Sequence, residues 1–371
     1  MSTIICRHLS SYFYLKDGVW VMKIRADSHY EAGRHHGALL REAGHPTYKF
    51  FRNFVFALCL DTVYLLFRKS FNALRIDEVY RDEIRGISEM TGIPTRRITV
   101  ANFIFDVFRR GIFCSTFNFF APDALIARNT DTFGWLARLS LRYQATVVFR
   151  ISVRGRLTFS HVGFALGVGV INGYNARGIA LNNHMVSNPR KIRNHRARAV
   201  PPVLQFRKIL EEARNLEEVK SRLSHVPFTY PALTLLTDCE NKTSAIFESV
   251  PGSHDFDPMT QPYKACTMHF VTESMSAYSR DACTVSKMRL ESIDQALRGK
   301  AFLDADAASD VLKNTCHGLN RRGGGKSVTN KGTFQSFIYL PLKDVVIISN
   351  GMKLPVSLSG EYVSIDFSRH F

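Results

Sequence analysis

The sequence lacks the cysteine pairs that mark small metal-binding and redox modules. Its seven cysteines are widely spaced and no two of them form a CxxC motif, which argues against a zinc ribbon or a thioredoxin-type site. The first 18 residues also lack the apolar core of a secretory signal peptide. We therefore expect a chain without structural disulfides in the reducing cytoplasm, and nothing in the sequence predicts a metal ion or a cofactor.

Long hydrophobic runs are absent as well. The most apolar stretch covers residues 54–67 and is interrupted by Asp61, so it is too short to cross a bilayer. We interpret it as a buried helix. The alternative is a helix that lies in a membrane surface, because Arg52, Arg68 and Lys69 flank it.

Acidic residues are scarce relative to basic ones. The chain has 49 Lys and Arg against 32 Asp and Glu, a net charge of +17, which is compatible with nucleic acid, an anionic membrane or an acidic substrate as partner. The basic stretch 189–198 has no interleaved aromatic residues for base stacking. The GGGKS run at 323–327 lacks a phosphate loop's earlier glycine, because Asn320 stands there. We therefore expect no nucleic-acid partner, and peripheral contact with anionic membrane through 52–69 and 189–198.

The chain does contain enough apolar material for a large core. Of its 371 residues, 45% are hydrophobic and 22% charged, which is typical of one large or two medium globular domains. Helical spacing over 27–43, 75–92 and 96–110 predicts that the first 110 residues are mainly helical. Further on, the patterns predict strands within 114–183, 232–250, 263–271 and 333–367, and helices at 203–224, 281–298 and 304–315. This order favours a layered α+β fold.

The segment around Cys114 carries the most chemical information. Cys114 is predicted to begin a strand, and a tight hairpin would return Arg128 and Asp131 to its side. A neighbouring guanidinium would lower the pKa of the thiol, and a carboxylate could orient an amine or imidazole base. The alternative interpretation is a buried core cysteine beside a structural ion pair.

Two motifs in this region carry a family resemblance. Residues 83–94 read EIRGISEMTGIP, and residues 128–131, which follow Cys114, read RNTD. Both resemble N-terminal-nucleophile cysteine hydrolases: the acid ceramidase and N-acylethanolamine acid amidase group, acyl-CoA:6-aminopenicillanic acid acyltransferase and the choloylglycine hydrolase-like linear amide C–N hydrolases. The resemblance spans residues 30–350 and includes weaker blocks at 168–183 and 267–293.

The resemblance implies a fold and an activation step. The fold would be α+β, a four-layer αββα sandwich with a helical N-terminal segment. The chain would cut its own Phe113–Cys114 bond, leaving residues 1–113 as a helical α chain and residues 114–371 as one integrated catalytic core. The freed α-amine of Cys114, with an ordinary pKa near 7.7–8.0, could then serve as base for its own thiol.

The resemblance also implies roles for single residues. Asp131 would hold the Cys114 amine, Arg128 and Arg280 would steady the thiolate and the aspartate, and Asn183 would be an oxyanion donor. The sequence departs from the pattern at Met268, which stands where the family has a second oxyanion asparagine and cannot donate a hydrogen bond. Either a neighbour such as His269 or a backbone amide substitutes, or activity is reduced.

The expected function is hydrolysis of a linear amide, in particular an N-acyl or fatty-acyl amide, through an acyl-thioester on Cys114. One alternative is an acyltransferase that moves the acyl group from a thioester to an amine. A second alternative is an inactive scaffold that binds lipid or nucleic acid through its basic surface.

Overall fold

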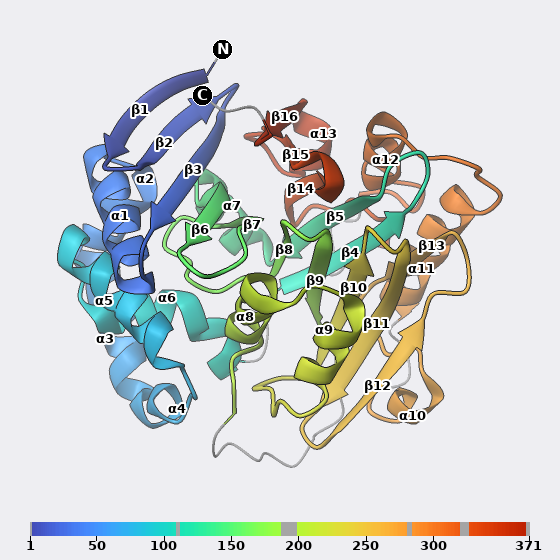
Figure 1. The fold of residues 1–371 in the computed structure, drawn as a ribbon, viewed down its shortest axis with the longest axis horizontal. Coiled ribbons are helices and arrows are strands. Elements are labelled where there is room, and N and C mark those ends of the chain that lie inside the picture. Colours follow the sequence, from blue (N-terminus) through green and yellow to red (C-terminus); the bar gives the residue numbers. More distant parts are fainter. Residues whose placement is uncertain (1, 109–111, 187–198, 280–283, 320–325, 369–371) are drawn as a thin grey trace.

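The computed structural model describes residues 2–108, 112–186, 199–279, 284–319 and 326–368. It is a mixed α+β structure built on two sheets (Figure 1). The larger sheet has ten strands in the spatial order β1 (Ser2–His8), β2 (Ser11–Lys16), β3 (Val19–Ala26), β6 (Thr146–Val153), β7 (Phe159–Phe164), β8 (Asn172–Asn175), β9 (Ile179–Met185), β10 (Ala232–Asp238), β11 (Thr243–Val250) and β12 (Ser253–Pro258). The smaller has six, in the order β13 (Tyr263–Cys266), β4 (Ile112–Phe119), β5 (Leu125–Thr132), β14 (Thr333–Leu340), β15 (Val345–Ser349) and β16 (Tyr362–Asp366).

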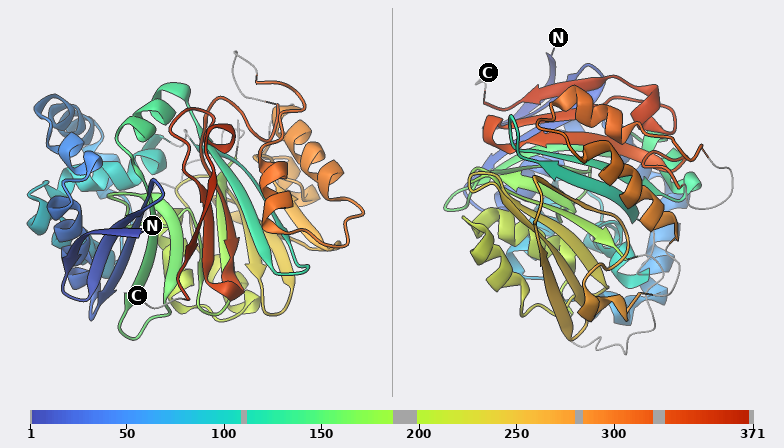
Figure 2. Two further views of the ribbon diagram at one scale, coloured as in Figure 1. Left: turned by 90° about the horizontal axis from the view of Figure 1, so that it is seen from above. Right: turned by 90° about the vertical axis from the view of Figure 1, so that its right-hand side faces the viewer.

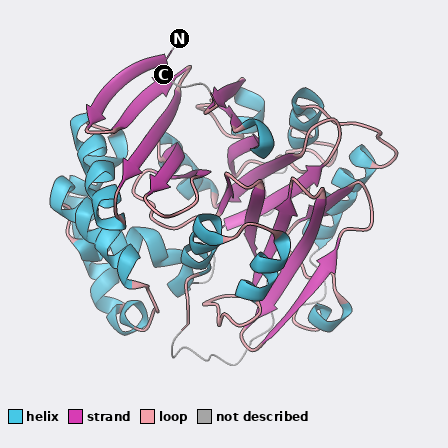
Figure 3. Ribbon diagram, viewed as in Figure 1, coloured by secondary structure: helices cyan, strands magenta, loops and turns pink. Residues whose placement is uncertain are grey.

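The helices gather on opposite sides of the strands (Figure 3). The first group is α1 (His29–Glu42), α2 (Pro46–Arg52), α3 (Phe54–Leu66), α4 (Arg68–Asn72), α5 (Glu78–Thr91) and α6 (Thr95–Phe108). Later helices are α7 (Gly134–Arg142), α8 (Pro202–Glu212), α9 (Leu216–Leu223), α10 (Glu273–Ser276), α11 (Thr284–Leu297), α12 (Ala305–Leu312), the 3-10 turn η1 (Pro341–Lys343) and α13 (Val356–Ser359).

The N-terminal segment is mainly helical, as expected, but it does not begin with a helix. It begins with the strands β1, β2 and β3, and β3 pairs in parallel with β6. The overlooked signal is the Asp17-Gly18 pair between two alternating runs, where both residues have positive φ, 46° and 84°. Such a pair is typical of a tight hairpin turn. Residues before Cys114 therefore form part of the large sheet.

Two glycines set the distance between α1 and α5. A Cβ atom on Gly33 would lie 2.1 Å from the carbonyl oxygen of Glu83, and one on Gly86 would lie 2.4 Å from that of Tyr30. Only glycine permits this close approach of two backbones. The crossing brings residues 83–94 of the family motif against the first helix.

Apolar side chains form three main clusters. The largest joins the ten-stranded sheet to the N-terminal helices and includes Leu39 and Phe149. The second contains side chains from both sheets, among them Val148 of β6 and Phe337 of β14. The third packs the six-stranded sheet against α11 and α12 and includes Ile293. Figure 2 shows the strands of the two sheets between these helices.

The apolar stretch at residues 54–67 is a helix, but its interpretation as a buried helix is wrong. Within α3 only Ala57 and Leu60 are buried. Phe54, Val55 and Leu66 are 80%, 68% and 74% exposed. Apolar periodicity predicted the helix, but a helix that is apolar on every side gives no indication of which side packs against the core.

The single helix expected over residues 203–224 is two helices. α8 ends before Ala213, whose φ and ψ of −80° and 138° are extended. Asn215 then caps α9, since its side chain accepts a hydrogen bond from the backbone N–H of Glu218.

Candidate active site

The hairpin of β4 and β5 places Cys114 opposite the RNTD motif. In this antiparallel pair, Cys114 lies across from Thr130 and Phe113 lies across from Asp131. Cys114 is completely buried in this chain. The hairpin predicted from the sequence is therefore present, and the Phe113–Cys114 bond lies within β4.

The guanidinium of Arg128 contacts the Cys114 thiol. Its Nη2 lies 2.7 Å from Cys114 Sγ and donates to the carbonyl oxygen of Asn183 at 2.8 Å. Its Nε donates to Thr130 Oγ1 at 3.1 Å. The buried Nη1 has no hydrogen-bond partner in the described parts of the chain. One donor of Arg128 therefore remains available close to the sulfur.

The pKa of the thiol differs from the sequence-based expectation. Burial raises the pKa of Cys114 to about 11, although the positive charge of Arg128 acts in the opposite direction. Desolvation outweighs the ion pair because the charged thiolate would have no contact with water in the intact chain. The expected lowering of the pKa is thus wrong for this uncut form.

Asp131 receives hydrogen bonds from three elements. Thr333 Oγ1 donates to Oδ1 at 2.6 Å, Asn330 Nδ2 donates to Oδ2 at 2.6 Å, and Arg289 Nη1 donates to Oδ2 at 2.7 Å. Arg280, to which this ion pair was assigned from the sequence, lies outside the described residues. Arg289 shares the inner face of α11 with Ile293 and Leu297, at helical spacing, and this spacing is the signal that could have identified it.

Asn183 reaches Arg128 through its backbone rather than its side chain. The side-chain nitrogen donates to Thr234 Oγ1 at 3.0 Å, and Tyr230 Oη donates to Asn183 Oδ1 at 2.9 Å. Its neighbour Asn182 is fully buried, and neither side-chain atom has a hydrogen-bond partner among the described residues. The two adjacent asparagines therefore have different environments, and the side chain of Asn183 is the one with hydrogen-bond partners.

Met268 provides no oxyanion donor from its backbone. Its N–H donates to Ser286 Oγ at 2.7 Å, and Nδ1 of His269 lies 2.7 Å from the same oxygen. The backbone N–H of Met268 and one ring nitrogen of His269 therefore both contact Ser286.

His184 lies near the strand that carries Cys114, and the sequence analysis gave it no role. Its Nε2 lies 2.8 Å from Thr116 Oγ1 and 3.4 Å from Cys266 Sγ. Burial, together with the charge of Arg128, lowers the pKa of His184 well below its ordinary value. The ring is therefore neutral, and it contacts Thr116 of β4, the strand that carries Cys114.

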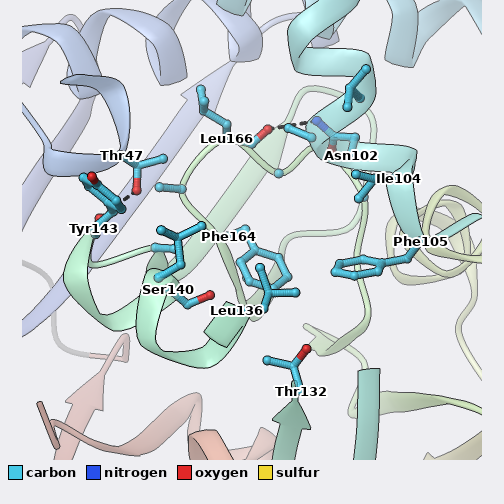
Figure 4. Close-up of a pocket in the computed structure, with 18 of the residues that line it drawn as sticks. Thr47, Asn102, Ile104, Phe105, Thr132, Leu136, Ser140, Tyr143, Phe164 and Leu166 are labelled. Carbon is cyan, nitrogen blue, oxygen red and sulfur yellow. Dashed lines mark hydrogen bonds between the residues drawn. The ribbon is translucent and has the colours of Figure 1, made fainter. Parts of the chain in front are cut away.

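A cavity of about 350 Å³ extends between α2, α3, α6 and α7. Cys114 shares one apolar cluster with the buried Met185 and Tyr230, against which Phe105 and Ile171 pack, and these four neighbours line the cavity. Figure 4 shows Phe105 from α6, Leu136 from α7 and Phe164 around the same space, with Thr132 at the end of β5. The wall is apolar over most of its surface, as expected for a site that takes a hydrocarbon chain.

Neither a metal site nor a membrane-spanning helix is found in the described ranges. No group of three or more His, Cys, Asp or Glu residues there could hold a metal ion. None of the described helices combines the length and the apolar character needed to cross a bilayer.

Three of the solved structures that match this chain are at most 16% identical to it, with TM-scores below 0.5. The N-acylethanolamine-hydrolyzing acid amidase ortholog of Caenorhabditis elegans is 16% identical, with 62% of this chain and 93% of that chain covered and a TM-score of 0.46. A variant of the conjugated bile acid hydrolase from Clostridium perfringens is 11% identical, with 70% and 93% covered and a TM-score of 0.48. Penicillin V acylase from Agrobacterium tumefaciens is 13% identical, with 70% and 79% covered and a TM-score of 0.39.

A family match gives the most direct comparison. No curated protein matches the chain. Residues 121–343, more than half of the chain, match the family described as acyl-coenzyme A:6-aminopenicillanic acid acyl-transferase. The match begins just after Cys114 and includes Arg128, Asp131 and Arg289. The chain therefore belongs to the acyl-coenzyme A:6-aminopenicillanic acid acyl-transferase family.

Proposed function

We propose that this protein is a cysteine amidase that activates itself by autoproteolysis and hydrolyses a linear fatty-acyl amide through an acyl-thioester on Cys114. The observation that carries the proposal is the contact of 2.7 Å between Arg128 Nη2 and Cys114 Sγ, on a hairpin that also holds Asp131. A guanidinium in this position favours a thiolate once water reaches the sulfur.

In the proposed activation, the thiol of Cys114 attacks the Phe113 carbonyl, and the acyl group moves from the Cys114 nitrogen to its sulfur, which frees the α-amine. Water then hydrolyses this thioester and leaves the Phe113 carboxylate and the free Cys114 thiol. Asp131, paired with Phe113 across the hairpin, is suited to hold that ammonium. The amine then takes the thiol proton as the thiolate adds to an amide substrate. It returns the proton to the departing amine, and water resolves the thioester.

The family-type architecture is part of this proposal. We infer a four-layer αββα sandwich, since one apolar cluster is shared by the two sheets and two others join each sheet to helices. Cleavage would yield residues 1–113 and 114–371, which remain packed as one unit because β3 lies between β2 and β6.

The fatty-acyl part of the proposal rests on the cavity. Four residues of the apolar cluster that contains Cys114 line it, as do Phe50, Phe56 and Leu139. Burying a methylene group there contributes about 0.8 kcal/mol. A long acyl chain would therefore bind with its carbonyl near Cys114 and its tail between α3 and α7.

The intact mass of the expressed protein tests the activation step. We expect two fragments divided between Phe113 and Cys114, and an uncut chain for Cys114→Ala. Cys239→Ala is the matched control, because Cys239 is equally buried but packs in the cluster shared by the sheets. A wild-type chain that stays whole and turns over no N-acyl amide would contradict the proposal.

An acyltransferase is the second candidate, since the family is named for that reaction. Both reactions share the acyl-thioester and differ in whether water or an amine resolves it. Offering a primary amine with a fatty-acyl thioester and following the new amide against the free acid separates the two.

We further propose that α3 contacts anionic membrane. Phe54, Leu58, Leu65 and Leu66 are more than half exposed on this helix, and Arg52, Arg68 and Lys69 flank it. Exposed apolar residues with basic neighbours are typical of interfacial helices. The second expected contact, residues 189–198, lies outside the described residues.

Vesicle sedimentation tests this contact. We expect stronger binding to anionic than to neutral vesicles, and a loss of binding in Leu65→Glu/Leu66→Glu. Leu342→Glu, at an exposed leucine on η1, is the control. Equal binding to both kinds of vesicle would exclude the electrostatic contribution.

A further inference from the structure

A turn at residues 330–333 is held against the end of β5. The backbone N–H of Thr132 donates to the carbonyl oxygen of Gly332 at 3.1 Å. A Cβ atom on Gly332 would lie 2.3 Å from the carbonyl oxygen of Thr132, so only glycine permits this close approach. Since Thr132 directly follows Asp131, the turn has a fixed place beside that carboxylate.

Hydrogen bonds within the turn orient the side chain of Asn330. Its Oδ1 accepts from the backbone N–H of Gly332 at 2.9 Å, and its Nδ2 donates to Asp131 Oδ2 at 2.6 Å. An amide oxygen can only accept, so the contact with Gly332 determines which end of the side chain faces Asp131. The opposite orientation would place the amide oxygen against the carboxylate.

Thr333 is oriented by the same turn. Its Oγ1 accepts from the backbone N–H of Asn330 at 3.0 Å and donates to Asp131 Oδ1 at 2.6 Å. The register between β14 and β5 shifts between Thr333 and Gln335, as in a β-bulge, and a bulge redirects the side chains next to it. Phe334, the residue within the shift, lines the apolar cavity. The turn thus joins the cavity wall to the residues that contact Asp131.

Three donors leave the Asp131 carboxylate with one free acceptor position in the described structure. A carboxylate offers about four such positions, two on each oxygen. Asn330 and Arg289 both donate to Oδ2, whereas Thr333 donates to Oδ1. The remaining position therefore belongs to Oδ1.

We propose that Asn330 and Thr333 are positioning residues: they hold the Asp131 carboxylate in the orientation in which Oδ1 accepts from the α-ammonium of Cys114 after cleavage. Both act through Asp131, which lies across the hairpin from Phe113, the residue before that amine. This proposal rests on the proposed amidase function and adds the element that aligns its base.

A positioned carboxylate changes the basicity of the amine. An α-amine has an ordinary pKa of about 7.7–8.0, and a carboxylate acceptor beside its protonated form raises that pKa. If Asp131 turns away, the pKa of the amine falls, and the acidic limb of the kcat/KM profile, which reports the base of the free enzyme, moves to lower pH. Substitutions in the turn leave unchanged the other charged or titratable groups near Cys114 in the described structure, which are Arg128 of β5, Arg289 of α11, His184 of β9, Cys266 of β13 and Tyr230.

Substitutions at Thr333 test the proposal, with a fatty-acyl p-nitroanilide as substrate. Thr333→Val keeps the shape and removes the hydroxyl group, so we expect kcat to fall by about tenfold and the acidic limb to move to lower pH by about half a unit. Thr333→Ser retains the hydroxyl group and should retain both wild-type values. Phe334→Leu is the matched control, because it should change KM through the cavity wall and leave the pH profile unchanged.

Asn330→Asp gives an independent test at the second residue. The aspartate keeps an acceptor for the N–H of Gly332 but, when ionised, cannot donate to Asp131, so fragments should form at least about tenfold more slowly. Asn314→Asp is its control, because Asn314 Oδ1 accepts from the backbone N–H of Cys316 at 3.0 Å in a similar turn. This variant should form fragments at the wild-type rate.

The outcomes separate this proposal from the amidase proposal. If Thr333→Val and Asn330→Asp form fragments and cleave the anilide as the wild type does, the positioning role is wrong and the amidase stands. A lower kcat with an unmoved pH profile would also overturn the positioning role, as would a Thr333→Ser protein that stays uncut. If the wild-type chain itself stays whole and cleaves no amide, the amidase proposal fails, and the positioning role fails with it because no α-ammonium forms.

Discussion

Two fully buried arginines, Arg128 and Arg207, occupy opposite kinds of environment. Arg207 lies in α8 between two carboxylates: its Nη2 is 2.7 Å from Glu83 Oε2 and its Nε donates to Glu211 Oε1 at 2.9 Å. His29 Nε2 and Tyr80 Oη each lie 3.1 Å from the Glu211 carboxylate. The charge of Arg207 is therefore compensated by two carboxylates, although its Nη2 has no partner with hydrogen-bond geometry among the described residues.

The surroundings of Arg128 are less complete. Its nearest partner is a thiol instead of a carboxylate, at 2.7 Å, and the buried Nη1 has no hydrogen-bond partner in the described structure. Buried donors without partners are rare in folded proteins. A donor held ready beside a nucleophile can stabilise negative charge that develops during a reaction. The two arginines therefore differ in the chemistry of their nearest partners, two carboxylates for Arg207 and a thiol for Arg128, rather than in burial.

The two arginines also differ in how their surrounding residues are distributed before and after the proposed cleavage point. His29, Tyr80 and Glu83 precede Cys114 in the sequence, whereas Arg207 and Glu211 follow it. The Arg207 cluster thus connects both parts of the chain. The Arg128 site, by contrast, is built mainly from residues that follow the cleavage point.

Replacing Arg207 should have the largest effect on stability. Arg207→Met leaves Glu83 and Glu211 buried with one cation fewer, so we expect the free energy of unfolding to decrease by about 3–5 kcal/mol. Urea unfolding in a Cys114→Ala background measures this on an uncut chain. Arg222→Met, at a half-exposed arginine that pairs with Glu212, should cost less than about 1 kcal/mol. Equal decreases in the free energy of unfolding of the two variants would show that the buried ion pair is no more important for stability than the half-exposed one.

Replacing Arg128 should lower the rate of processing more than the stability of the chain. Arg128→Gln removes the charge beside the sulfur, and we expect processing to slow by about 10²–10³-fold, the usual cost of a lost electrostatic group at a reacting centre. In the Cys114→Ala background its stability loss should be smaller than that of Arg207→Met. The rate of fragment formation after synthesis measures the first effect. Processing at the wild-type rate would show that Arg128 is structural.

The ion pair between Arg207 and Glu211 should also make the stability of the protein depend on pH. Burial alone would raise the pKa of Glu211, but Arg207 and His29 outweigh it and hold the pKa at about 2, below the ordinary value of 4.5. A lowered pKa means that the stabilisation is complete above pH 4.5 and is lost as the pH falls towards 2. Its full size is about 3 kcal/mol.

We therefore expect Glu211→Gln to have a lower free energy of unfolding than the wild-type protein at pH 6. This difference should become smaller as the pH falls to 3. Unfolding in urea at both pH values measures the gap. Glu217→Gln is the control, because Glu217 is 80% exposed on α9 and should show no comparable change. A gap that stays constant with pH would mean that Glu211 acts through packing.

The sequence carried enough information for the family and the hairpin but not for the whole site. The spacing of Cys114, Arg128 and Asp131 is local, so a single turn brings them together. Arg289, Asn330 and Thr333 reach Asp131 from elements that are more than 150 residues away in the chain. A pattern within one segment cannot show which distant side chain contacts Asp131, which explains why the sequence did not predict Arg289.

The same limit applies to the surfaces of helices. The apolar run of α3 predicted a helix correctly, but whether its leucines face the core or the solvent depends on partners elsewhere in the fold. Likewise, the apolar cavity is lined by residues of α2, α3, α6 and α7 and by parts of β7 and β9. No single stretch of sequence predicts such a space.

The parallel pairing of β3 with β6 has a consequence for residues 114–371. Val21–Ala26 lies beside Val148–Val153, so main-chain hydrogen bonds hold the first part of the chain inside the large sheet. Residues 114–371 produced alone would expose β6 as an open edge, and such an edge is a template for association with other chains. By covering β6, the N-terminal part would protect this edge of the sheet against aggregation.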